Sequence, residues 1–560
     1  MGQVRHPLEE FEIFGIHFKV ADDLTRKPHL LPHVNIYYLG SDMLPVLRSH
    51  LTTLNINDTL RLISHLASRR ALDPAQFEAR LREVGLGPEE IFRDYQFSLM
   101  VRLLLEGETD ARFPRREANP QDILKCCQLA TNALPEADKL LGRAIRGDVG
   151  ALFVRKAYEQ FPDQEREEYF GRNLAIYRQI ASSVQGEYGF RLQKAYEDAT
   201  GLTLDDIWFI GFAVYAHVIS QPGRYFTKSE FTESKDLPGL TTEKIDRFFE
   251  LNSTDYAGYR AALDAGGTGK PGYESYNLNP LLRWPILRVD EERFALPLPR
   301  LLLRRITEGV YYDLVRTDQG RFGNVLGLSF EIYVGRLLQD LPGVPLLIPQ
   351  LTYGDRRTEV TCEWIAVDKD VAILIECKTR ALSALAKVTG DRHRIRKDLS
   401  REHGVVDGII KLKRVRDAIE SRAPGLEQLH HVTKVMGLLV TLDDFYLANS
   451  PYIRGIVDEV LAKRGEKACP PEFQLTHVGG LEWLARLLRV PGTSIAQVLQ
   501  FKVGDPTLGL RELDFKSFVP QAAERFIPGE KVDLLLPLHE KALDLFTGEL
   551  ADAFRVPPRT

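Results

Sequence analysis

The chain has 560 residues, of which 44% are hydrophobic and 27% are charged, and its formal net charge at pH 7 is −5. This composition is typical of a soluble globular protein with roughly three or four domains, and it excludes a chain that is basic overall. The longest apolar run, residues 207–219, is shorter than the roughly 20 residues that cross a bilayer, so no membrane partner is expected.

The five cysteines favour a reducing compartment. They stand at positions 126, 127, 362, 377 and 469, and none has the spacing of metal ligands. The opening segment MGQVRHPLEEFEIF mixes charges early and lacks the pattern of a signal peptide. We therefore expect a cytoplasmic protein.

Residues 1–275 are predicted to be mainly helical. A short strand pair in 11–20 and 34–39 precedes several helix-start signals, each followed by spaced apolar residues. These signals are Asn57-Asp58, Asp73-Pro74, Pro88 and Pro120, and apolar stripes continue through 173–184, 191–199 and 204–220. Such stripes are more often core than ligand site.

A glycine-rich stretch, DAGGTGKPGY at 264–273, ends the helical region. It differs from a phosphate-binding loop, because Asp264 stands where the first Gly is needed and Pro271 replaces the Ser or Thr that holds magnesium. A flexible linker is the better interpretation. Residues 276–320 are then predicted to form a hairpin and a connecting helix, 300–316.

Residues 321–465 are predicted to form an α/β domain. A helix at 323–341 precedes an edge strand at 344–353, which two prolines interrupt. The stretch TCEWIAVDKDVAILIECKTR, 361–380, has the pattern of a hairpin whose second strand is continuously apolar and therefore central. A helix at 405–421, a buried strand at 432–442 and a helix at 449–463 complete the domain, and 466–560 is a mixed C-terminal region with a helix at 480–489.

The end of this central strand carries charged residues. Glu376 and Lys378 are two positions apart, so both point to one face of the sheet. A hairpin with its turn at Asp368 to Asp370 brings Glu363 back beside Glu376. Two carboxylates and an amine at one point suit a hard divalent cation held by oxygen ligands, and phosphodiester hydrolysis.

Glu331 is a third candidate. It lies in GNVLGLSFEIYVGRLLQDL, a helix that is apolar almost all round. A buried carboxylate without a partner costs several kcal/mol, roughly, so Glu331 needs a metal, a cation or a cleft open to solvent.

Together these residues resemble the PD-(D/E)xK nuclease superfamily, with Glu363, Glu376 and Lys378 in its signature. The resemblance implies a restriction-endonuclease-like α/β/α fold and a metal-dependent endonuclease, with Mg²⁺ or Mn²⁺ bound by Glu331, Glu363 and Glu376 and with Lys378 supporting water attack. It also implies a site role for Lys411 on the following helix, for which an exposed surface lysine is the alternative.

The chain departs from the family pattern at one position. The first acidic residue is usually Asp, whereas this chain has Glu363 there. The longer side chain still ligates a metal but shifts its position, and Glu359 and Asp368 are the possible substitutes.

The expected class is α+β: a helical N-terminal half, 1–275; a hairpin and helix, 276–320; a nuclease-like domain with a mixed sheet, 321–465; and a C-terminal region, 466–560. The architecture resembles prokaryotic defence or DNA-processing effectors, whose helical half senses a signal or binds a protein partner or a second copy of the chain.

Nucleic acid is the expected partner. Between Lys378 and Arg416 twelve Lys or Arg face four Asp or Glu, a local net charge of +8 that fits a phosphate backbone. DNA is favoured, and RNA or tRNA is the alternative. A further alternative is a catalytically silent module that binds nucleic acid or a protein. We interpret Asp443, Asp444 and the histidines at 393, 403, 430 and 431 as turn or surface residues.

Overall fold

In the computed structural model, the described residues are 10–13, 16–19, 43–72, 93–107, 115–131, 149–160, 167–184, 188–232, 240–265, 279–380, 382–504, 509–529 and 536–554. The chain forms two compact units. The first comprises Met1–Gly147, Gly211–Ser234 and Phe248–Arg305, and the second comprises Asp148–Ile210, Lys235–Arg247 and Ile306–Thr560. Both units therefore draw on segments from either side of residue 210.

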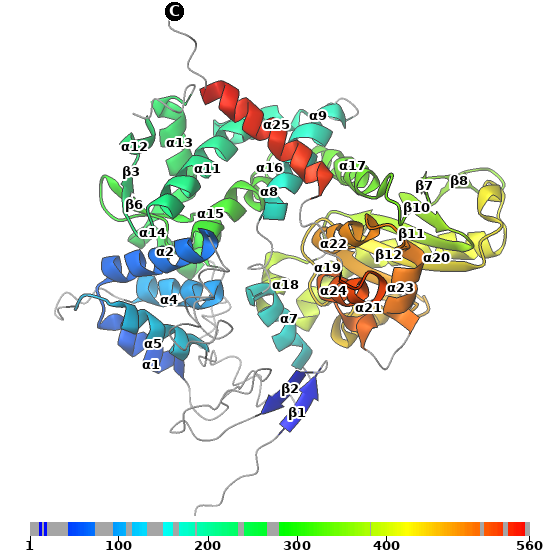
Figure 1. The fold of residues 1–560 in the computed structure, drawn as a ribbon, viewed down its shortest axis with the longest axis horizontal. Coiled ribbons are helices and arrows are strands. Elements are labelled where there is room, and N and C mark those ends of the chain that lie inside the picture. Colours follow the sequence, from blue (N-terminus) through cyan, green and yellow to red (C-terminus); the bar gives the residue numbers. More distant parts are fainter. Residues whose placement is uncertain are drawn as a thin grey trace, which may run out of the picture. The chain divides into compact units, whose positions relative to one another are not determined.

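The first unit is mainly helical, with two small sheets (Figure 1). One sheet pairs β1 (Glu10–Ile13) with β2 (Ile16–Lys19), and the other has the order β3-β6-β5-β4. The remaining elements are α1 (Met43–Thr52), α2 (Ile56–Leu72), α4 (Asp94–Glu106), α5 (Pro120–Thr131), β3 (Phe226–Thr227), α12 (Ser229–Thr232), β4 (Ser253–Asp255), α14 (Tyr256–Ala265), β5 (Ile286–Arg288), β6 (Arg293–Ala295) and α15 (Pro299–Ile306). The helices α11 (Leu204–Ser220) and α13 (Thr242–Asn252) contribute residues to both units.

The second unit is built on a five-stranded sheet of order β13-β12-β11-β10-β7. β7, β10 and β11 pair antiparallel, whereas β11, β12 and β13 run parallel. The strands are β7 (Leu346–Pro349), β10 (Trp364–Asp368), β11 (Val371–Lys378), β12 (Lys434–Thr441) and β13 (Phe473–His477), and a separate hairpin pairs β8 (Thr352–Tyr353) with β9 (Glu359–Val360).

The helices of the second unit precede the sheet in the chain, connect its strands or follow it. Before the sheet come α7 (Val149–Gln160), α8 (Glu167–Asn173), a π-helical segment (Leu174–Ile180), α9 (Ala181–Val184), α10 (Leu192–Thr200), α16 (Glu308–Leu314) and α17 (Gln319–Leu338). Between and after its strands come α18 (Ala384–Thr389), α19 (Arg392–Leu399), α20 (Val405–Glu420), α21 (Pro451–Lys463), α22 (Val478–Leu488), α23 (Ile495–Gly504), α24 (Phe515–Phe526) and α25 (Pro537–Phe554).

The two main helices of the sheet, α17 and α20, cover opposite faces of it. Gly335 of α17 lies against the indole of Trp364. Trp364 and Ile375 are partners in the strand register, so their side chains lie on the same face of the sheet. Gly408 of α20 lies against Glu376, the next residue of β11, and side chains of adjacent strand residues point to opposite faces. Glu376 is therefore enclosed between β11 and α20.

The α+β class and the helical N-terminal half are confirmed. The hairpin of β10 and β11, the central position of β11 and the edge position of β7 are also as predicted. The sheet extends past residue 465, because β13 from the expected C-terminal region pairs with β12. The predicted strand at 34–39, the helix starts at Asp73 and Pro88 and the linker at 266–273 lie outside the described residues.

Two predicted helices differ from the structure. The helix expected at 300–316 is interrupted at Thr307, whose φ of −105° and ψ of −84° separate α15 from α16. The helix expected at 173–184 contains the π-helical turns of Leu174–Ile180. Apolar spacing does not reveal either feature, because both keep the same side chains buried.

Among the described residues, no single helix is long and apolar enough to cross a membrane. Within this part of the chain, only the helix pair α10 and α11, taken together, has the required length and apolar composition, and the two helices are bent by 63° relative to each other.

Two glycines of α17 provide a test of this packing. A Cβ atom at Gly335 would lie 2.1 Å from Cζ2 of Trp364, whereas at Gly327 no atom lies within 4 Å. We expect Gly335→Ala to destabilise the protein by about 1–3 kcal/mol. Gly327→Ala should stabilise it by about 0.5–1 kcal/mol, because Ala is the better helix former. Urea unfolding of both variants measures the difference, and equal effects would contradict this packing.

Candidate active site

The geometry of β11 brings the charged residues together. Trp364 of β10 pairs with Ile375 of β11, so the same register, continued by one residue, places Glu363 opposite Glu376. The backbone N–H of Cys377 donates to Oε2 of Glu363 over 2.9 Å, which fixes that carboxylate at the strand end. The two carboxylates are thus held side by side by backbone pairing.

Two lysines neutralise this pair of carboxylates. Lys378 Nζ donates to Oε1 of Glu376 over 2.7 Å, and Lys411 Nζ donates to Oε1 of Glu363 over 2.9 Å. Lys411 Nζ also lies 3.0 Å from Oε2 of Glu376. The side chain of Glu376 is 0% exposed and that of Lys378 is 18% exposed, so the network opens to solvent on the side of the lysines.

The charges of Glu363, Lys411 and Lys378 affect the ionisation of Glu331. Its backbone oxygen accepts the indole N–H of Trp364 over 2.8 Å, which ties α17 to β10. Burial, and after it the negative charge of Glu363, raises the pKa of the Glu331 carboxyl to about 7. The positive charges of Lys411 and Lys378 oppose this rise. Within the described part of the chain, this carboxylate forms no hydrogen bond or ion pair.

The carboxyls of Glu363 and Glu376 differ in acidity. Burial, followed by the charge of Glu363, raises the pKa of Glu376 to about 7. Burial also opposes ionisation of Glu363, but hydrogen bonds from Glu376 and Lys411 hold its pKa below the usual value. When one proton is shared between the two, it therefore resides on Glu376.

Burial disfavours the charged form of Lys411, but Glu376 and Glu363 outweigh it and raise its pKa. Lys411 therefore remains an ammonium between the two carboxylates. Of the five residues singled out from the sequence, Glu363, Glu376, Lys378 and Lys411 are joined by ion pairs. Glu331 is linked to them only through the effect of their charges on its pKa.

The considered substitutes for Glu363 lie elsewhere. Glu359 is exposed on β9, and Asp368 accepts a hydrogen bond from Ser494 at the opposite end of β10. Asp443 pairs with Lys387, and the carboxylate of Asp444 lies 3.7 Å from Nδ1 of His477.

Gly408 is a contributor that sequence reasoning missed. A Cβ atom there would lie 3.2 Å from Cγ of Glu376, 3.1 Å from Cε of Lys378 and 2.7 Å from Cδ1 of Leu439. Only a glycine lets α20 approach the charged end of β11 this closely. A glycine inside a helix pattern was the available signal, since such a glycine often has a packing or functional reason.

A divalent cation would find its donors among these carboxylates. Oε2 of Glu376 is buried and faces the ammonium of Lys411 at 3.0 Å, and carboxylate oxygens are the ligands that Mg²⁺ and Mn²⁺ prefer. The ammonium of Lys411 already lies 2.9 Å from Oε1 of Glu363 and 3.0 Å from Oε2 of Glu376. Across the described ranges, no three His, Cys, Asp or Glu side chains are already placed to hold a metal ion together.

Comparisons with protein-family models, with curated proteins and with solved structures found no match to this chain.

The raised pKa of Glu331 predicts a pH-dependent effect of Glu331→Gln. A carboxyl whose folded pKa is about 7, against 4.5 as its ordinary value, stabilises the protein fully below pH 4.5. This stabilisation is lost as the pH rises through 7. Gln mimics the neutral carboxyl, so the variant should be about 1–2 kcal/mol more stable than wild type near pH 8.5 and equal to it near pH 4.5. This difference in stability is smaller than the full pKa difference implies, because the carboxyl is partly solvated.

Urea unfolding at the two pH values measures this difference. The exposed Glu359→Gln is the matched control and should give no pH-dependent gain. A gain for Glu331→Gln that is the same at both pH values would contradict the proposed burial of this carboxyl.

Proposed function

We propose that the protein is a metal-dependent nuclease that hydrolyses phosphodiester bonds in nucleic acid, with DNA favoured over RNA or tRNA. The observation that carries this proposal is the convergence of Glu363, Glu376 and Lys378 at the end of β11. Two carboxylates held by backbone register, with an amine beside them, form a site suited to an attacking water and a phosphate.

Each residue has a role in this proposal. Glu363 and Glu376 would hold Mg²⁺ or Mn²⁺, assisted by Glu331. When bound, the cation would supply a Lewis acid that activates water near neutral pH. Lys378, partly exposed beside Glu376, donates to the negative charge that develops on the phosphate oxygens. Lys411 favours the ionised form of both buried carboxyls and lowers the pKa of Glu363.

Local charge supports a nucleic-acid substrate. The helix α19 exposes Arg394 and Lys397, and α20 exposes Arg414. Lys and Arg side chains of this kind bind phosphates without reading sequence. We further propose, from architecture alone, a role in prokaryotic defence or DNA processing in the cytoplasm, with the helical half binding a signal, a protein partner or a second copy of the chain.

One observation favours a second candidate, a catalytically silent module that binds nucleic acid or a protein. The ammonium of Lys411 satisfies Glu363 and Glu376 with an internal cation, so the cluster is balanced by residues of the chain itself. Such a cluster needs no metal for its stability.

Cleavage assays separate the two candidates. We expect Glu376→Gln and Lys378→Met to lower the cleavage rate by about 100-fold or more, because each removes a group that acts in the transition state. Purified wild type and variants are incubated with plasmid, linear DNA and total RNA in Mg²⁺, Mn²⁺ or EDTA.

Lys434→Met is the matched control for this experiment. Lys434 is exposed at the start of β12, the opposite end of the sheet, and its substitution should leave cleavage unchanged. Equal cleavage by wild type and Lys378→Met would remove the catalytic assignment. Binding of nucleic acid without cleavage under any of these conditions would favour the silent module.

A further inference from the structure

A cavity lies at the carboxyl ends of β11 and β12, within the second unit. Thr379 and Arg380 line it directly after Lys378, and Leu442 donates its N–H to the backbone oxygen of Lys378 over 2.8 Å. Two residues of chain span at most about 7 Å, so the cavity begins within about that distance of the proposed catalytic lysine. Ligands of open α/β sheets commonly bind at this edge.

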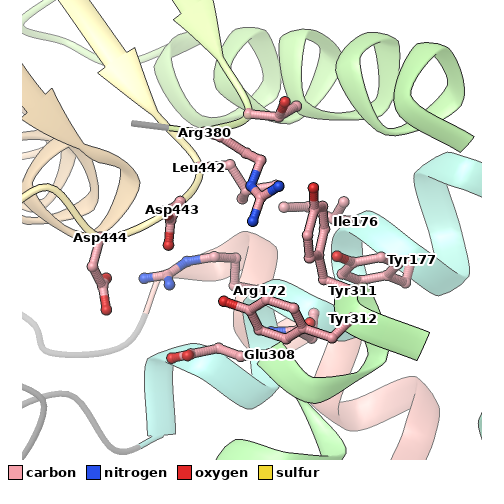
Figure 2. Close-up of a pocket in the computed structure, with 12 residues that line it drawn as sticks. Arg172, Ile176, Tyr177, Glu308, Tyr311, Tyr312, Arg380, Leu442, Asp443 and Asp444 are labelled. Atoms are coloured by element: carbon pink, nitrogen blue, oxygen red, sulfur yellow. The ribbon is translucent and has the colours of Figure 1, made fainter. Parts of the chain in front are cut away.

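The opposite wall of the cavity is aromatic (Figure 2). Tyr177 and Ile176 come from the π-helical segment, and Tyr311 and Tyr312 come from α16. The guanidinium of Arg380 lies 4.9 Å from the ring centre of Tyr311. π-helical turns occur frequently at functional sites, and they give this wall an unusual backbone.

The aromatic wall has one exposed member. The ring of Tyr312 is 41% exposed although it contacts Tyr311 edge to face, with ring centres 5.3 Å apart. An exposed tyrosine offers a planar ligand a face on which to stack.

The charges of the cavity disfavour a phosphate inside it. Two arginines line it, Arg172 and Arg380, against three carboxylates, Glu308, Asp443 and Asp444. Arg172 is committed to the buried Glu482, with two hydrogen bonds of 2.7 and 2.6 Å. A flat ligand with N–H donors on its edge fits this combination better than an anion does, because carboxylates accept from such donors.

We propose that this cavity binds an unpaired nucleobase of the substrate strand, adjacent to the phosphate at Lys378. The inference rests on the proposed function and narrows its substrate to single-stranded or locally opened nucleic acid. The base stacks on the tyrosines and presents its N–H edge to the carboxylates of Glu308 and Asp444, while the carboxylate of Asp443 is paired with Lys387. The space between the lining atoms, counted together with the open mouth of the cavity, is about 610 Å³.

Binding without hydrolysis tests the proposal. Wild type in EDTA is titrated with a short single-stranded oligonucleotide that carries 2-aminopurine at successive positions, and with the matching duplex. We expect quenching of the fluorescence at one position, and weaker binding of the duplex. Tyr312→Leu should weaken single-strand binding about 10-fold through the lost stacking, whereas Tyr312→Phe should retain it.

Tyr188→Leu is the matched control, because Tyr188 is 39% exposed and does not line the cavity. The proposal is overturned if Tyr312→Leu and Tyr188→Leu bind the single strand equally well, or if wild type shows neither quenching nor a preference for single strands. Thermal unfolding of both variants shows that each remains folded.

The cleavage assay separates this inference from the proposed function. If binding depends on Tyr312 but no phosphodiester is hydrolysed in Mg²⁺ or Mn²⁺, the base site stands and the nuclease proposal fails. If wild type and Tyr312→Leu cleave duplex and single-stranded DNA at equal rates, the nuclease proposal stands and the base site is rejected.

Discussion

The ammonium of Lys411 between the carboxylates of Glu363 and Glu376 is the interaction on which the charged end of β11 depends. Strand pairing forces the two carboxylates together, and Glu376 is fully buried. Without a cation between them, two ionised carboxylates at this separation would repel each other in surroundings of low dielectric constant. The fold therefore brings in α20, whose Gly408 allows the helix to approach and whose Lys411 supplies the charge.

The position of these charged residues at the end of β11 explains why Lys378 reaches the solvent. The apolar residues of β11 fill the core on both faces of the sheet, and only its last residue, Lys378, reaches the solvent. Lys378 lies at that boundary, with the tyrosine-lined cavity directly beyond it. The proposed hydrolytic site, at the end of β11, and the proposed base site, at residues that follow β11 and β12, thus lie at the same edge of the sheet.

Much of this arrangement was predictable because it is local. The apolar run of β11, the hairpin turn and the alternation that places Glu376 and Lys378 on one face all follow from a short stretch of sequence. Glu331 was identifiable as a carboxylate on an apolar helix. The pairing of Lys411 with Glu363 was not predictable in this way, because it joins positions 48 residues apart through tertiary packing.

The cavity was the least predictable feature. Its lining comes from residues 172–177, 308–312, 379–380 and 442–444, and no local pattern relates these segments. Asp443 and Asp444 were interpreted as turn acids, and in the structure they also line the cavity. The π-helical segment has the apolar spacing of an ordinary helix, so sequence alone predicts its burial but not its backbone.

Calorimetric titration of Mn²⁺ into the metal-free protein near pH 8 tests the central claim, that these carboxylates form a cation site. At that pH the carboxyl of Glu376, with a pKa of about 7, is ionised and can bind the metal. We expect wild type and the exposed control Glu359→Gln to bind Mn²⁺ saturably. Glu376→Gln should bind Mn²⁺ at least about 10-fold more weakly. Absence of binding by wild type, or equal binding by Glu376→Gln, would contradict this claim.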